Sequence, residues 1–358
     1  MPQPSSSKAI GQQILALVIG TLSGMLAHYF GLPLPWMLGS MIGITIAALS
    51  GAPIRPPMRL RTIFLPVIGV MLGAGVSPDI AEAIGRWTVT FALLPLFIVI
   101  SAAVSYTFYR RIGRYERVTA YFSAMPGGLN DMILLGSAAG GDERKIALAH
   151  ASRILVVVVF VVMFFGMAMG VSSAGAVRSG VPLDALTLRD WLILSSSAVF
   201  GAPLARLLRL PAGQILGPMV LSGLAHVTQL VTVAPPTVIV NIAQIAIGTV
   251  IGSRFVGSSL RDIGRDLVLG VGSSILMIGV AVLFSRIVHL LTATELSLAF
   301  LAYSPGGLTE MSLLALAMGQ EVAYVSVMHV GRLTLVIFAA APFFRMIQRF
   351  RGAAPDGK

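Results

Sequence analysis

Apolar residues run along this chain in long blocks, and short polar segments separate the blocks. In the first half, the expected helical elements are residues 10–30, 34–50, 61–76, 87–108, 118–139 and 146–170. In the second half, they are residues 190–207, 213–230, 237–253, 267–288, 296–318 and 322–344. A helix of about 20 apolar residues crosses ~30 Å of hydrocarbon. The pattern therefore predicts an all-α polytopic membrane protein.

The composition agrees with this fold class. Hydrophobic residues make up 56% of the chain and charged residues 11%, and the mean hydropathy is +0.90. The net charge of +11 comes from arginines that are scattered between the apolar blocks. We therefore expect the lipid bilayer as a partner and no nucleic acid. The block 10–30 is too long for the core of a signal peptide, so we interpret it as the first span.

The two halves of the chain repeat one another in sequence. Residues 32–41, LPLPWMLGSM, align with residues 210–219, LPAGQILGPM. A shift of 179 residues relates many further pairs, among them Gly69 and Gly248, Gly73 and Gly252, Asp131 and Glu310, His150 and His329, and Arg153 and Arg332. We therefore divide the chain into a first membrane repeat (1–170), a linker (171–187) and a second membrane repeat (188–358).

The positive charges predict how these repeats cross the membrane, because Lys and Arg concentrate in cytoplasmic loops. We let residues 118–139 and 296–318, the fifth element of each half, enter and leave on the same side. Nineteen of the 25 Lys and Arg residues then lie inside, and the outer loops keep only Arg86, Arg178, Arg189 and Arg286. This predicts five transmembrane helices plus one re-entrant helical hairpin per repeat, with both termini cytoplasmic. Since five is odd, the second repeat is inverted relative to the first.

Each predicted hairpin contains a Pro-Gly-Gly segment that breaks its helix, because proline lacks an N–H and glycine permits positive φ. An acid follows in the first turn after each break: Asp131 and Glu310. A carboxylate there can cap the helix start. It can also serve as a proton or cation site at membrane depth. Both interpretations stay open.

His150 and Arg153, and likewise His329 and Arg332, stand three residues apart, so each pair shares a helix face. The arginines either snorkel to the headgroups or pair with the hairpin acid or a substrate anion. The predicted binding residues are Pro126, Gly127, Gly128, Asp131, His150, Arg153, Pro305, Gly306, Gly307, Glu310, His329 and Arg332.

The stretch SPGGLTEMSLLALAMGQEVAYVSVMHVGRL, residues 304–333, resembles the AbrB-duplication family of bacterial inner-membrane proteins, and the resemblance covers nearly the whole chain. Its first copy, residues 125–155, matches less closely, with Asn130-Asp131 in place of Thr309-Glu310. Members carry labels such as ammonia monooxygenase or AbrB-type regulator. The resemblance implies a bacterial inner-membrane location. The predicted architecture is similar to that of sodium-coupled glutamate and hydroxycarboxylate carriers.

We expect a secondary transporter, coupled to protons or sodium, for a small solute, with an anion as one option. The alternative is a non-transporting membrane regulator or scaffold protein, in which the buried charges serve assembly. We do not expect an enzyme, a metal or a cofactor, because the chain has no cysteine and its five histidines include no close pair. Glycine pairs four residues apart allow close helix contact, either within one chain or in a homodimer.

Overall fold

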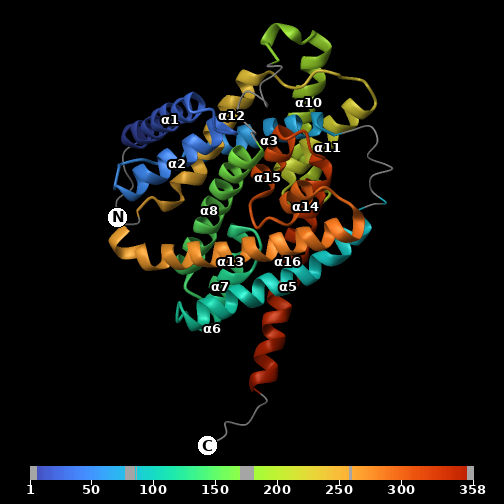
Figure 1. Cartoon of the computed structure of the whole chain (residues 1–358). Helices are drawn as coiled ribbons and strands as arrows, with labels where there is room; N and C mark the ends of the chain where they lie inside the picture. Colours follow the sequence, from blue (N-terminus) through green and yellow to red (C-terminus); the bar gives the residue numbers. More distant parts are fainter. Residues whose placement is uncertain (1–5, 77–84, 86, 170–180, 258–259, 353–358) are drawn as a thin grey trace, which may run out of the picture. The chain divides into compact units, whose positions relative to one another are not determined.

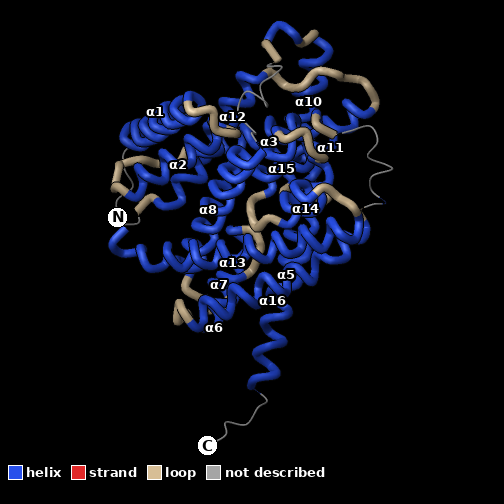
Figure 2. The backbone as a smooth tube through the Cα atoms, viewed as in Figure 1, coloured by secondary structure: helices blue, strands red, loops and turns tan. Residues whose placement is uncertain are grey.

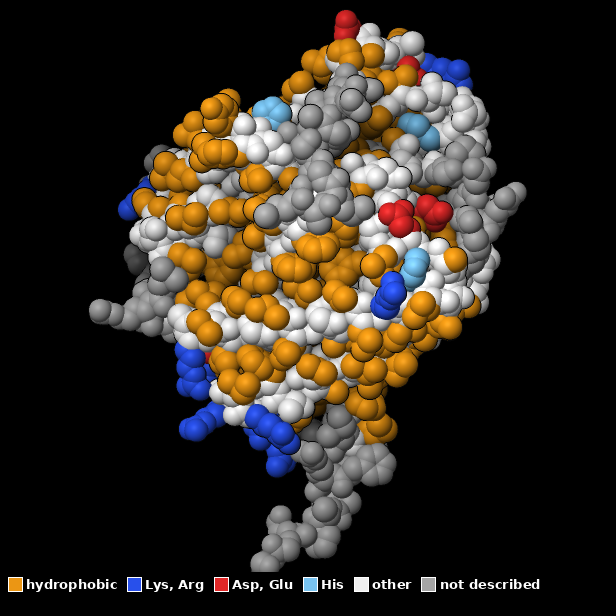
Figure 3. Space-filling view, viewed as in Figure 1, with side chains coloured by type: hydrophobic (Ala, Val, Ile, Leu, Met, Phe, Trp, Pro, Cys, Tyr) orange, Lys and Arg blue, Asp and Glu red, His pale blue; other side chains and the backbone are white. Residues whose placement is uncertain are grey.

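The chain folds entirely into helices over the residues that the computed structural model describes, 6–76, 85, 87–169, 181–257 and 260–352. These residues form fourteen α-helices and two short 3-10 helices, and they include no strand (Figures 1 and 2). Hydrophobic side chains cover much of the face in Figure 3. The predicted all-α fold is confirmed.

The helix bounds follow the predicted elements closely. In the first half the helices are α1 (Ser6–Tyr29), α2 (Pro35–Leu49), α3 (Met58–Ala74), α5 (Thr88–Arg111), α6 (Arg117–Ala124), α7 (Leu129–Ala138) and α8 (Glu143–Met169). In the second half they are η1 (Leu183–Ala185), α10 (Leu188–Leu207), α11 (Gly213–Val227), α12 (Thr237–Gly252), η2 (Ser253–Phe255), α13 (Leu260–Thr292), α14 (Leu296–Tyr303), α15 (Leu308–Ala317) and α16 (Val322–Gly352). Each predicted fifth element is two short helices broken at Pro-Gly-Gly.

Six of the described helices are long and apolar enough to cross a membrane. These segments are Lys8–Tyr29, Thr88–Arg111, Glu143–Phe165, Thr237–Phe255, Ile263–Thr292 and Val322–Met346. The other four predicted crossings are the helices α2, α3, α10 and α11, which are shorter or less apolar. The chain is thus a multi-pass helical membrane protein, and the count of ten crossings stays a prediction.

Contacts divide the chain into two compact units, and each takes segments from both halves of the sequence. Unit 1 comprises Met1–Arg86, Leu155–Gly264 and Leu308–Ser326. Unit 2 comprises Trp87–Ile154, Arg265–Gly307 and Val327–Lys358. The predicted division at 170 and 188 stays a prediction about the sequence, and residues 171–180 of its linker lie outside the described residues.

Unit 1 is built from helices that touch backbone to backbone. Its main pairs are α1 with α2, α2 with α12, α3 with α11, and α10 with α11. A Cβ at Gly69 or Gly73 of α3 would overlap a carbonyl oxygen of α11, at Ile215 or Met219. A Cβ at Gly248 or Gly252 of α12 would overlap a carbonyl oxygen of α2, at Met37 or Met41. These glycine pairs therefore serve packing within one chain.

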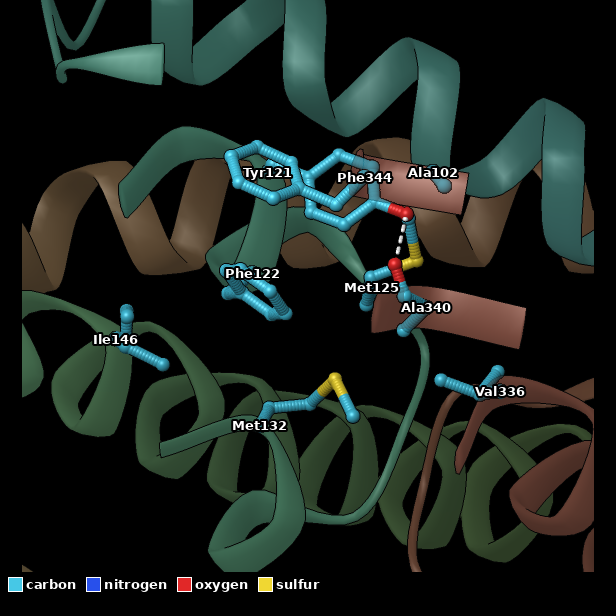
Figure 4. Close-up of a cluster of buried hydrophobic side chains, with 9 residues drawn as sticks. All are labelled: Ala102, Tyr121, Phe122, Met125, Met132, Ile146, Val336, Ala340 and Phe344. Atoms are coloured by element: carbon cyan, nitrogen blue, oxygen red, sulfur yellow. Dashed lines mark hydrogen bonds between the residues drawn. The ribbon is translucent and has the colours of Figure 1, made fainter. Parts of the chain in front are cut away.

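Unit 2 holds α5, α6, α7, α13 and α14, with most of α16 and the first part of α8. Side chains of α5, α6, α7, α8 and α16, together with Met125 between α6 and α7, form a buried cluster (Figure 4). Its members are Ala102, Tyr121, Phe122, Met125, Met132, Ile146, Val336, Ala340 and Phe344. The Tyr121 hydroxyl donates to the Ala340 carbonyl at 2.8 Å, as the dashed line shows. This bond attaches α6, the first half-helix, to α16.

Candidate functional site

The first helix break leaves carbonyl groups without helical partners. α6 ends at Ala124 and α7 begins at Leu129. The intervening backbone is extended at Met125, with φ −66° and ψ 130°, and at Gly128, with φ −67° and ψ 137°. The last carbonyls of a helix have no N–H partner within it, and hydrocarbon offers none. The chain must therefore supply donors from another element.

Those donors come from α8. Arg153 donates through Nη1 to the Met125 carbonyl at 2.7 Å and through Nη2 to the Gly127 carbonyl at 2.9 Å. His150 Nε2 lies 2.9 Å from the Phe122 carbonyl oxygen. We call His150, Arg153 and these three carbonyls the first clamp. A guanidinium at this position both supplies the missing donors and opposes the partial negative charge of the helix end.

The second break has the same arrangement. Arg332 of α16 donates through Nη1 to the Ser304 carbonyl and through Nη2 to the Gly306 carbonyl at 2.8 Å, and His329 Nε2 lies 3.0 Å from the Leu301 carbonyl oxygen. These residues form the second clamp. In both clamps the bonded residues are 28, 28 and 26 positions apart along the chain.

The hydrogen bonds assign the protonation of both histidines. Arg153 Nη2 lies 2.9 Å from His150 Nδ1, and Arg332 Nη2 lies 3.0 Å from His329 Nδ1. Because a guanidinium only donates, each Nδ1 accepts, and each Nε2 carries the proton that goes to a carbonyl. Both imidazoles are therefore neutral positioning groups. Neither can take up a proton at Nδ1 without losing its bond to arginine.

The two arginines are buried cations without a carboxylate partner. Arg153 is 6% exposed and Arg332 is 3% exposed. Among the described residues, neither makes an ion pair, and the Nε atom of each has no hydrogen-bond partner. Both arginines belong to unit 2. Since a buried charge is costly without a counter-charge, this pair favours binding of an anion.

The clamps are linked within unit 2 by α16. A Cβ at Gly127, in the first break, would come within 2.7 Å of Val336 Cγ1 of α16. Val336 lies four residues after Arg332 on the same helix. The helix that holds the second clamp therefore packs directly on the first break. A residue larger than glycine at position 127 would therefore have to displace the side chains of Val336 and Met132.

The two acids differ in their surroundings. Asp131, in the first turn of α7, is half-buried, and Glu310, in the first turn of α15, is 6% exposed. Each acid lies in the first turn of its helix, which agrees with a role at the helix start. Within the described part of unit 2, no ion pair joins Asp131 to Arg153, whose donors go to carbonyls instead.

Some groups of this region were not among the predicted residues. A search of the sequence by side-chain type cannot find backbone acceptors, which here are the carbonyls of Phe122, Met125, Leu301 and Ser304. In unit 1, Arg61 and Arg254 are the cations that act electrostatically on Glu310. Arg254 is half-buried, and its Nε lacks a hydrogen-bond partner within the described residues. The charge pattern of the sequence predicted only that both arginines lie in cytoplasmic loops. It did not predict that they act on Glu310.

Comparison with known proteins assigns the family. The family model described as "Transition state regulatory protein AbrB" matches residues 36–348, which include both breaks and both clamps. The chain belongs to the AbrB family. A Bacillus subtilis protein, "Uncharacterized protein YhjN", is 25% identical over 364 residues, covering 96% of this chain and 94% of its own. An Escherichia coli protein, "Putative regulator AbrB", is 26% identical over 345 residues, covering 94% of this chain and 95% of its own.

Proposed function

We propose that this AbrB-family protein is a secondary transporter for a small anion. The observation that carries the proposal is the pair of buried arginines, Arg153 and Arg332, each at a helix break and each without a carboxylate partner among the described residues. Each retains a buried Nε–H that makes no hydrogen bond to any described residue. A carboxylate or another small anion would supply both the missing acceptor and the counter-charge.

We further propose that the chain consists of two inverted repeats in a bacterial inner membrane, with both termini cytoplasmic. The equal residue separations in the two clamps support an internal repeat. The matching contacts of Gly69 with Ile215 and of Gly248 with Met37 support it as well. The distribution of Lys and Arg supports the inversion and the re-entrant hairpins. Inverted repeats with broken helices commonly bind substrate near the midplane of the membrane.

In this mechanism the histidine of each clamp holds its arginine in place, and the arginine donates hydrogen bonds to two carbonyls. The guanidinium is thereby fixed, so an anion that binds to its Nε–H and its charge does not have to order the arginine side chain first. The N–H groups at the start of α7 add a partial positive charge after the first break. Glu310 is the buried acid to which we assign coupling to protons or sodium, and no enzymatic step or cofactor is involved.

Uptake into proteoliposomes tests the proposal. The purified protein would be reconstituted and offered a panel of radiolabelled monocarboxylates, dicarboxylates and inorganic anions under proton and sodium gradients. We expect uptake of at least one anion, and its loss in Arg153→Gln and Arg332→Gln. Arg286→Gln, which changes an exposed arginine of α13, is the matched control. Size-exclusion profiles separate loss of function from loss of folding. Wild-type uptake by folded Arg153→Gln and Arg332→Gln proteins would disprove the anion site.

A second candidate function rests on the names of the family and of the Escherichia coli relative, both of which contain a regulatory term. The chain would then be a non-transporting membrane regulator or scaffold protein, and the clamps would serve assembly. This function predicts that no solute of the panel moves. It also predicts that clamp variants which still fold lose a protein partner that the wild-type chain retains in mild detergent.

A further inference from the structure

Unit 2 contains a groove that borders the first helix break through Met125 and Val336 but includes neither clamp arginine in its lining. It has a volume of about 660 Å³ and runs between α5, α6 and α16. This volume lies within the ~300–1,000 Å³ range of small-molecule pockets. The side chains that line it are Ile98, Val99, Ala102, Ala103, Tyr106, Arg117, Val118, Tyr121, Met125, Val336, Ala339, Ala340, Phe343 and Phe344.

The lining is apolar apart from one charged group and two tyrosines. The Tyr121 hydroxyl is already bound to the Ala340 carbonyl. The rim residues Ala103 of α5 and Phe343 of α16 are exposed, so the groove is open along one side. Both of these helices include a segment long and apolar enough to cross a membrane. An open apolar groove on such helices faces hydrocarbon and suits an acyl chain.

The charged group is Arg117, the first residue of α6. Arg117 is exposed, and it makes no hydrogen bond or ion pair with any described residue. Arg111 and Arg114 of the preceding segment are also exposed, whereas the neighbouring acid, Glu116, accepts a hydrogen bond from Thr119. Figure 3 shows Lys and Arg side chains gathered around the end of α6. The groove therefore combines an apolar trough with a free cation among basic neighbours.

We propose that this groove holds an anionic phospholipid, with one acyl chain along the apolar lining and the phosphate on Arg117. The charge decides between this occupant and a second copy of the chain. The chain carries +11 net charge, so a second copy would bring more positive charge to a basic surface. An anionic phospholipid supplies the opposite charge and the acyl chain in one molecule.

Native mass spectrometry of the intact protein tests this site. The protein would be extracted in mild detergent with phosphatidylglycerol or phosphatidylcholine of the same chain length, and bound lipid would be counted. We expect one tightly held phosphatidylglycerol and weaker binding of phosphatidylcholine. Arg117→Gln should lower the preference for phosphatidylglycerol about fivefold, as loss of one cation–headgroup contact would. Ala103→Trp, which fills the groove from its open rim, should reduce both lipids.

The matched controls are Arg286→Gln, which removes an exposed arginine of α13 outside the lining, and Ala92→Trp, which adds the same ring to an exposed position of α5 away from the groove. Both controls should bind lipid as the wild type does. Equal binding of the two phospholipids by the wild type would overturn the proposal, as would an undiminished phosphatidylglycerol adduct in Ala103→Trp. A dimer that Ala103→Trp converts to monomer would overturn it as well, because a second copy would then occupy the groove.

Discussion

The clamps make a prediction about stability that the structure allows to be worked in detail. His329 is fully buried, donates to the Leu301 carbonyl and accepts from Arg332. His329→Leu keeps the approximate volume of the side chain but removes both bonds. A carbonyl and a guanidinium N–H then lose a partner in the interior. Each unsatisfied group costs about 1–3 kcal/mol, so we expect a loss of roughly 2–6 kcal/mol in the free energy of unfolding.

His150→Leu should have a similar effect, because the first clamp makes the same bonds to Phe122 and Arg153. The assay is reversible unfolding in mixed micelles with increasing SDS, followed by circular dichroism. Thr334→Val on α16 is the control, since its hydroxyl bonds only to a carbonyl of its own helix, and it should change stability by less than about 1 kcal/mol. If both histidine variants were as stable as this control, the clamps would not hold the helix breaks.

Three further predictions concern packing, coupling and topology. Gly248→Ala should destabilise the protein by about 1–3 kcal/mol, because the new methyl group would overlap the backbone of α2. Gly279→Ala is the control, since it has open space around it, and it should be neutral or slightly stabilising. Thermal unfolding in detergent compares the stability of the two variants. Glu310→Gln should abolish gradient-driven uptake but keep exchange of labelled for unlabelled anion, and unchanged gradient-driven uptake would remove Glu310 from the coupling step. Single cysteines at Ser173 and Ser259 should react with an impermeant maleimide from outside and from inside the cell respectively, and reaction of both from the same side would contradict the inverted arrangement.

The helices and their breaks could be predicted because local chemistry determines them. The apolar blocks gave all the main helices, and Pro126 and Pro305 marked both interruptions, since proline cannot donate the hydrogen bond that continues a helix. The spacing of three residues placed His150 beside Arg153 on one face of α8, and the structure joins these two side chains.

The partners of the arginines could not be predicted in the same way. A search by residue type pairs Arg153 with a carboxylate, but the structure pairs it with carbonyls that the helix break leaves free. Such acceptors belong to every residue and have no sequence signature. The compact units, which take segments from both halves of the chain, and the groove beside Arg117 also depend on tertiary contacts between distant segments. Local periodicity carries no information about such contacts.

The most direct test of the central claim is the current that follows an anion concentration jump on proteoliposomes adsorbed to a solid-supported membrane. We predict a transient current for at least one small anion with the wild-type protein. The current should be absent when both Arg153 and Arg332 are replaced by glutamine and retained in Arg286→Gln. No current and no uptake of labelled anion across the panel would together contradict transport, since symport of one monovalent anion with one proton or sodium ion moves no net charge. An unchanged current in the folded double variant would contradict the arginine pair as its site.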